Sequence, residues 1–143
     1  MHDQQGYYLE DLEVGMEASF AKTVTDADIV LFAGISGDTN PVHIDEEAAQ
    51  NSVFEGRIAH GMLTASFVST VLGTKLPGPG CIYLSQSLRF KAPVRIGDTV
   101  TAKVRVKEVI TVKKRIVLET ICQVAGKDVV DGEATVMVTS RNS

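Results

Sequence analysis

The sequence predicts an α+β fold in which a long antiparallel sheet wraps around one nearly all-apolar helix. Residues 80–140 contain four long, β-branched stretches in which polar and apolar residues broadly alternate. Before them, residues 62–76 form an apolar stretch of helical length, and Pro77 with Gly78 follows as its stop signal. Serine and threonine supply nearly all of its polar side chains, which indicates a helix buried on most sides. A sheet with one apolar face can cover such a helix.

The chain before this helix combines a strand with shorter helices. Residues 16–25 are typical of a strand. Thr25 then offers an N-cap, and Asp26 and Asp28 lie in the first helical turn, where the helix dipole favours negative charge. We expect this helix to end near Gly34–Gly37. A further short helix is expected at residues 45–50, which also begin with acidic side chains.

The four predicted strands of the second half cover residues 80–94, 98–112, 114–126 and 128–140. Residues 99–106, within the second of these strands, alternate most clearly, with Thr and basic residues at odd positions and Val or Ala at even positions. That pattern predicts one solvated and one buried sheet face. Long strands leave unpaired edges, so we expect a homodimer in which two copies join their sheets.

The composition indicates one soluble globular domain spanning residues 1–143. The net charge is −4 and no basic block occurs, so nucleic acid is not an expected partner. The N-terminus lacks the features of a secretory signal, and no apolar stretch is long enough to cross a membrane. Cys81 and Cys122 have neither metal nor disulfide spacing, which predicts reduced thiols and a cytoplasmic location.

The segment GDTNPVHID, residues 37–45, is the main candidate for chemistry, and we expect it to be a loop without a regular helix. An Asp followed by Asn-Pro is, on its own, ordinary turn chemistry. Here Pro41 stiffens the chain between Asp38 and His43, so both side chains can converge on one water as an acid/base pair. Asp38, His43 and Asp45 as metal ligands are a weaker interpretation, because their spacing matches no familiar metal signature.

The segment AHGM, residues 59–62, is the second candidate. Gly61 can be a plain loop glycine before a core helix. It can also present free N–H groups at a helix N-terminus, where a thioester carbonyl would be polarised and an enolate stabilised. For His60 we favour a structural role over a catalytic one.

Together with RIAHGMLTASFVS (57–69), PGPGCIYLSQSLRFKAPVRIGD (77–98) and DGEA (131–134), these residues resemble the (R)-specific enoyl-CoA hydratases. These are the MaoC-like dehydratase group of the hot-dog fold, in their short single-domain bacterial form. The resemblance implies a curved antiparallel sheet around a central helix and an edge-to-edge homodimer. No cofactor is expected, because the sequence has no G-x-G-x-x-G fingerprint and no recognisable metal spacing. It also implies reversible hydration of trans-2-enoyl-CoA to (R)-3-hydroxyacyl-CoA, as a supply for polyhydroxyalkanoate synthesis.

The resemblance also assigns roles to individual residues. The catalytic pair falls on Asp38 and His43, the amide that steadies the loop on Asn40, and the oxyanion-hole N–H on Gly61. Ser69 falls on a serine near the catalytic carboxylate.

Further residues are expected to contact the substrate because of where they lie in the predicted fold. Phe54, Ser69 and Leu72 are expected to shape the acyl pocket. Arg89, Lys91 and Arg95 are candidates for the coenzyme A phosphates, although they also suit the solvent face of a strand.

Three other functions remain open from the sequence. A 3-hydroxyacyl-[acyl-carrier-protein] dehydratase would use the same chemistry on another carrier. A hot-dog thioesterase would need a carboxylate placed for attack at the thioester carbonyl, which this loop does not suggest. A non-catalytic acyl-binding subunit would be expected to lack Asp38 or His43, and both are present.

Overall fold

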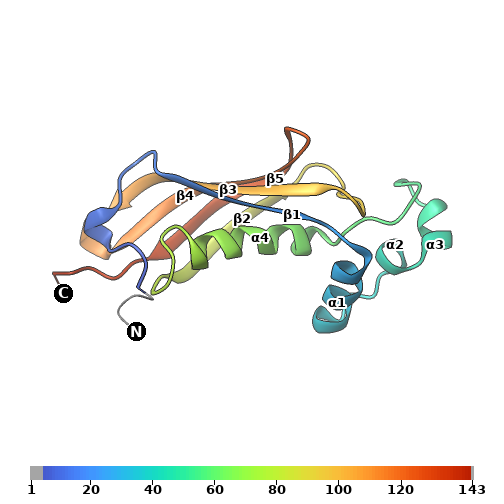
Figure 1. Cartoon of the computed structure of the whole chain (residues 1–143), viewed down its shortest axis with the longest axis horizontal. Coiled ribbons are helices and arrows are strands. Elements are labelled where there is room, and N and C mark those ends of the chain that lie inside the picture. Colours follow the sequence, from blue (N-terminus) through green and yellow to red (C-terminus); the bar gives the residue numbers. More distant parts are fainter. Residues whose placement is uncertain (1–4, 143) are drawn as a thin grey trace.

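The computed structural model describes residues 5–142, and its main feature is one antiparallel sheet that curves over a central helix (Figure 1). The sheet has five strands in the order β1-β3-β4-β5-β2. Their bounds are β1 Glu17–Thr23, β2 Ile82–Phe90, β3 Thr99–Ile110, β4 Arg115–Val124 and β5 Lys127–Met137. β1 and β2 are therefore the two edges. Short 3₁₀ turns occur at Leu9–Asp11 and Thr111–Lys113.

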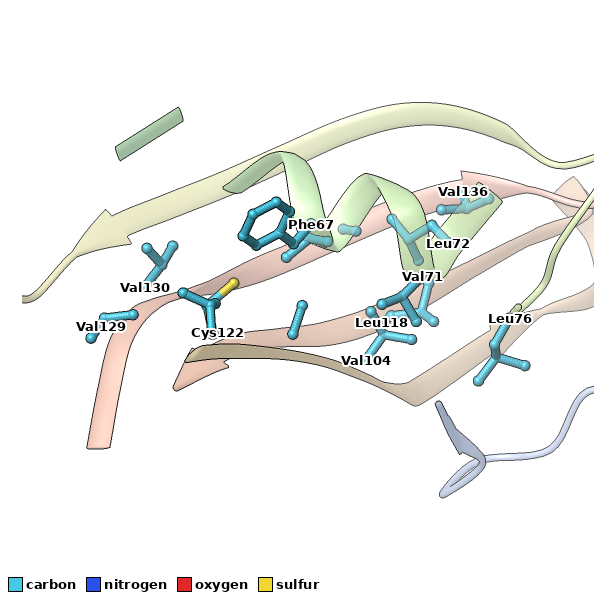
Figure 2. Close-up of a cluster of buried hydrophobic side chains, with 14 of the residues drawn as sticks. Phe67, Val71, Leu72, Leu76, Val104, Leu118, Cys122, Val129, Val130 and Val136 are labelled. Atoms are coloured by element: carbon cyan, nitrogen blue, oxygen red, sulfur yellow. The ribbon is translucent and has the colours of Figure 1, made fainter. Parts of the chain in front are cut away.

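The central helix is α4, Gly61–Thr74, and it packs on the concave face of the sheet (Figure 1). Phe67, Val71 and Leu72 of this helix face apolar side chains of the strands (Figure 2). The strand residues at this contact include Val104, Leu118 and Val136, each fully buried. Burial of these side chains removes apolar surface from water, and this is the main stabilising term of the fold.

Three shorter helices lie beyond the N-terminal end of α4 (Figure 1). They are α1 Asp26–Ser36, α2 Pro41–Ile44 and α3 Glu46–Gln50. Thr25 caps α1 through a capping box, in which its hydroxyl accepts from Asp28 N while the Asp28 carboxylate accepts from Thr25 N. The expected N-cap and first-turn acids are thus confirmed.

The predicted elements all occur, with shifted ends. Alternation in β3 is confirmed, since its even-numbered residues from Val100 to Val106 are buried. The expectation that residues 37–45 hold no helix is wrong, because α2 forms within them. Pro41 at the first helical position has a backbone angle suited to a helix, and Asn40 caps it. The predicted strands extend one to four residues beyond the observed ends, where turns begin, except at the start of β5, which the prediction places one residue too late.

Candidate active site

Local hydrogen bonds between side-chain oxygens and backbone N–H groups hold the segment from Asp38 to His43. Asp38 Oδ1 accepts from Asn40 N at 3.2 Å, and Asn40 Oδ1 accepts from Val42 N at 3.2 Å. Asn40 is thereby the N-cap of α2, and its amide steadies the turn that leads into His43. The carboxylate of Asp38 stays at the exposed start of the segment, whereas His43 is 8% exposed.

Residues 57–60 run beside this segment and fix His43 from several sides. The His43 ring Nδ1 lies 2.9 Å from the carbonyl oxygen of Ile58. Arg57 Nε donates to the carbonyl oxygen of His43 at 2.6 Å, and its Nη2 pairs with Asp26 at the start of α1. A carbonyl only accepts, so Nδ1 of His43 carries the hydrogen and Nε2 of the neutral ring is a lone-pair acceptor.

Asp38, His43 and His60 converge. One carboxylate oxygen of Asp38 and one ring nitrogen of each histidine all lie within 4.8 Å of one another. The separation suits a single water that bonds to both the carboxylate and a ring nitrogen, since each such bond spans about 2.8 Å. Asp45, the third residue of the metal interpretation, instead caps α3 by accepting from Ala48 N.

A cavity of about 450 Å³ opens beside these groups. Its wall contains the predicted residues Asp38, Phe54, Gly61 and Lys91, together with residues from the end of β2, the following turn and β5. The complete lining is Asp38, Phe54, Ile58, Ala59, His60, Gly61, Met62, Thr64, Phe90, Lys91, Ala92, Pro93, Val94 and Val130. A mostly apolar pocket with a few convergent polar groups is the usual form of a small-molecule site.

Gly61 is the first residue of α4, so its N–H has no acceptor within the helix. The ring of Phe90 lies against it: a Cβ added at Gly61 would come within 2.6 Å of Phe90 Cδ1 and Cε1. Sequence reasoning assigned no role to Phe90 or Thr64, although both lie in segments that carry the resemblance. Thr64 Oγ1 is buried at the cavity without a hydrogen-bond partner among the described residues, so a bound molecule can use it.

Ser69 and Leu72 lie apart from this cavity. Ser69 is on the exposed face of α4, and Leu72 is 1% exposed within the core (Figure 2). Neither belongs to the cavity wall described above. Their predicted influence on acyl length stays a prediction.

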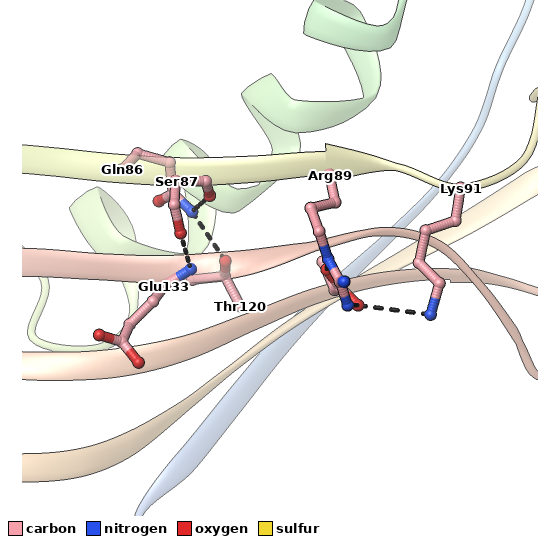
Figure 3. A network of polar contacts seen from close by, with 7 residues as sticks. Gln86, Ser87, Arg89, Lys91, Thr120 and Glu133 are labelled. Atoms are coloured by element: carbon pink, nitrogen blue, oxygen red, sulfur yellow. Dashed lines mark hydrogen bonds and ion pairs between the residues drawn. The ribbon is translucent and has the colours of Figure 1, made fainter.

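The three basic candidates already have intramolecular partners. Arg89 and Lys91 both pair with Asp131, at 3.0 and 3.4 Å (Figure 3). The Arg89 guanidinium, followed by Lys91, holds the pKa of the Asp131 carboxyl below its usual value. Two cations share this one carboxylate, and of the two only Lys91 belongs to the cavity lining given above. Arg95 differs, because its Nη2 donates to the carbonyl oxygen of Phe54 at 2.5 Å.

The fold and the Asp38–His43 segment define a member of a hydratase and dehydratase class built on a helix-wrapping sheet. The MaoC-like domain model matches residues 11–136, and the chain belongs to that family.

Three relatives are especially similar. The (R)-specific enoyl-CoA hydratase of Rhodospirillum rubrum is 61% identical over 135 residues, covering 94% of each chain. The unliganded R-hydratase PhaJ1 of Pseudomonas aeruginosa has a TM-score of 0.90 at 43% identity, covering 95% of this chain and 88% of its own. The (R)-hydratase of Aeromonas caviae, described as involved in polyhydroxyalkanoate biosynthesis, has a TM-score of 0.88 at 45% identity, covering 90% and 98%.

Proposed function

We propose that this protein hydrates trans-2-enoyl-CoA to (R)-3-hydroxyacyl-CoA and catalyses the reverse dehydration. The observation that carries the proposal is the convergence of Asp38 and His43 within 4.8 Å beside an apolar cavity. The 61% identity to an (R)-specific enoyl-CoA hydratase over nearly the whole chain supports it. Coenzyme A is preferred over an acyl carrier protein as carrier, because that relative is named for a coenzyme A substrate.

In this mechanism one water lies between the Asp38 carboxylate and Nε2 of His43. Both groups accept hydrogen bonds, so the water donates one hydrogen to each and keeps an oxygen lone pair for the substrate. The oxygen attacks C3 while one member of the pair takes a proton from the water. The proton that the pair has taken from the water is then delivered to C2, while the hydroxyl on C3 keeps the other hydrogen, which completes the addition of water across the double bond. The two groups act as a coupled acid/base pair.

Charge that develops on the thioester oxygen during attack is stabilised by the N–H of Gly61. This donor lies at the positive end of the α4 dipole, where negative charge is favoured. The apolar cavity between Phe54 and Val130 accommodates the acyl chain. Arg89 and Lys91 meet the coenzyme A phosphates, which compete for the cations now shared by Asp131.

We also propose a homodimer joined at the β2 edge. β2 is an edge strand on which Ile82, Tyr83, Leu84 and Phe90 expose 40–55% of their surface. An exposed apolar edge is covered in most stable proteins.

A cytoplasmic location and a role in polyhydroxyalkanoate supply belong to the same proposal. None of the helices within residues 5–142 is long and apolar enough to span a bilayer.

The decisive experiment follows the absorbance of the enoyl thioester as crotonyl-CoA is hydrated, with chiral analysis of the product. Asp38→Asn and His43→Ala are each expected to lower kcat/KM by about 10²–10⁴-fold, the usual contribution of a general acid or base. Val112→Ala, in the exposed turn between β3 and β4, serves as a folded control. Either catalytic variant keeping more than a tenth of wild-type kcat/KM would remove that residue from its role.

Activity is expected to survive dialysis against EDTA, because the proposed chemistry uses only protein groups and water. The measurement compares initial rates before and after chelation. Loss of activity that Zn²⁺ or Mg²⁺ restores would instead favour a metal held by the cluster of Asp38, His43 and His60.

A further inference from the structure

We propose that His60 is a positioning residue that fixes both members of the Asp38–His43 pair. This inference rests on the proposed function for its kinetic test. His60 is 2% exposed and is the N-cap residue of α4, directly before Gly61, yet its side chain makes no capping bond to the helix. A buried imidazole at a helix start that does not cap the helix has its partners elsewhere.

The first partner is the backbone of Asp38. His60 Nε2 lies 2.9 Å from the Asp38 carbonyl oxygen. Because a carbonyl oxygen only accepts, Nε2 carries the hydrogen in this bond. The bond joins the start of α4 to the exposed segment that holds the Asp38 carboxylate. It therefore ties the proposed oxyanion donor and the proposed acid/base carboxylate to one side chain.

The second partner is the ring of His43. The two imidazoles stack with centroids 3.9 Å apart and planes 29° apart. On another side, Phe32 of α1 lies 4.9 Å from the His60 ring at an interplanar angle of 54°. His60 is thus held between α1 and α2. The stack limits rotation of the His43 ring about its bond to Ile58 O, and it thereby holds Nε2 of His43 in one orientation.

The remaining nitrogen of His60, Nδ1, is buried without a hydrogen-bond partner among the described residues. A second N–H there would be an unsatisfied buried donor, so the neutral tautomer with hydrogen on Nε2 is the favoured form. The arrangement leaves proton transfer to Asp38 and His43 and gives His60 a purely orienting part.

The kinetic test uses variants that separate the hydrogen bond from the stack. His60→Phe keeps a stacking ring and loses the donor, whereas His60→Gln keeps a donor near the position of Nε2 and loses the ring. Because misplacement of reacting groups by about 1 Å can cost ~10²-fold, His60→Phe is expected to lower kcat about 10–100-fold with little change in KM. His60→Gln is expected to recover part of kcat relative to His60→Phe.

Val68→Ala is the control for stability, because Val68 is buried on the same helix but does not line the cavity. All rates are measured well below the melting temperature of each variant. Val68→Ala and His60→Phe are compared at matched melting temperature. If both lose the same amount of kcat, His60 acts only through the general stability of the fold. Wild-type kcat in both His60 variants would overturn the proposal outright.

A spectroscopic test stands apart from activity. Nitrogen-15 shifts of the two imidazoles in the wild-type protein are expected to show hydrogen on Nε2 of His60 and on Nδ1 of His43. In His60→Phe we expect His43 to keep its hydrogen on Nδ1, while the nitrogen-15 shifts of its ring change. In His60→Gln we expect a larger change in these shifts, because the stacked ring is lost. Hydrogen on Nδ1 of His60 would contradict the proposal. If the wild-type protein hydrated no enoyl-CoA, the proposed function would be wrong. The spectra would still test the contacts of His60, because they do not depend on activity.

Discussion

At the scale of single residues, the site depends on which hydrogen-bonding groups remain free once the local bonds are made. Nδ1 of His43 is committed to the Ile58 carbonyl, which leaves Nε2 as an acceptor. The N–H of Gly61 has no acceptor within α4, because Gly61 begins that helix. The proposed mechanism requires that neighbouring side chains leave both groups accessible, and the Phe90 ring lies against Gly61.

Gly61→Ala is expected to lower kcat/KM by at least about tenfold while the protein stays folded, because small displacements of reacting groups are costly. The new methyl group would lie 2.6 Å from the Phe90 ring, and that ring, 55% exposed, can move away. Its movement changes the cavity wall beside the proposed N–H donor. Steady-state kinetics with crotonyl-CoA measure the effect.

Gly73→Ala is the matched control, since Gly73 lies on the same helix and a Cβ there meets nothing within 4 Å. It should keep wild-type activity. Equal kinetics for wild type and Gly61→Ala would show that close approach at Gly61 is not required.

At the scale of elements, α4 carries two different faces. One face presents Phe67, Val71 and Leu72 to the sheet (Figure 2), and the opposite face exposes Met62, Ser66 and Ser69. Residues three apart on a helix are neighbours along the surface, but Ser69 and Leu72 still differ in burial because they flank the boundary between these faces. The exposed face is narrow, in agreement with the few polar residues of the helix.

Leu72→Ala is expected to lower the free energy of unfolding by about 2–5 kcal/mol, the usual range for a truncated core leucine. Urea denaturation measures it, with Ser69→Ala as the exposed control on the same helix. A loss under about 1 kcal/mol would contradict full burial, because a buried leucine contributes more than that.

The same variant also tests the acyl pocket. If the chain reaches Leu72, the ratio of kcat/KM for eight-carbon over four-carbon substrates should rise in Leu72→Ala and fall in Leu72→Phe. An equal ratio in both variants would show that the acyl chain ends within the cavity described beside Phe54 and Val130.

At the scale of the whole molecule, the sheet ends in two unlike edges. β1 is paired only with β3, and β2 only with β5, so each has one free side. The β2 edge is the more apolar, and it continues into the cavity wall at Phe90 and Lys91. A second copy that pairs at the β2 edge would therefore bury apolar surface close to the candidate active site of each copy.

Light scattering at micromolar concentration is expected to give about twice the chain mass of 15.4 kDa. Leu84→Lys should favour the monomer, because a charge on an edge strand opposes strand pairing. Val112→Lys is the control: Val112 is 95% exposed in the turn between β3 and β4, so the mass should not change. A monomer mass for the wild-type protein would contradict the proposed dimer.

Local patterns in the sequence determined most elements of this fold. Alternation in 99–106 identified the buried face of β3, and the capping residues Thr25 and Asp28 located the start of α1. Such signals are readable because they depend on neighbours three or fewer positions away. The candidate pair Asp38 and His43 was visible for the same reason, since Pro41 lies between them.

The tertiary structure alone decided which distant residues complete the site. His60 bonds to Asp38 across 22 positions, and the Phe90 ring at the end of β2 lies against Gly61 at the start of α4. It also decided that Leu72 is a core residue and that Arg95 is occupied by the Phe54 carbonyl. These contacts depend on how α4 packs against the sheet and on how residues 57–60 run beside α2. No local pattern records them, because packing brings together side chains whose spacing in the chain is arbitrary.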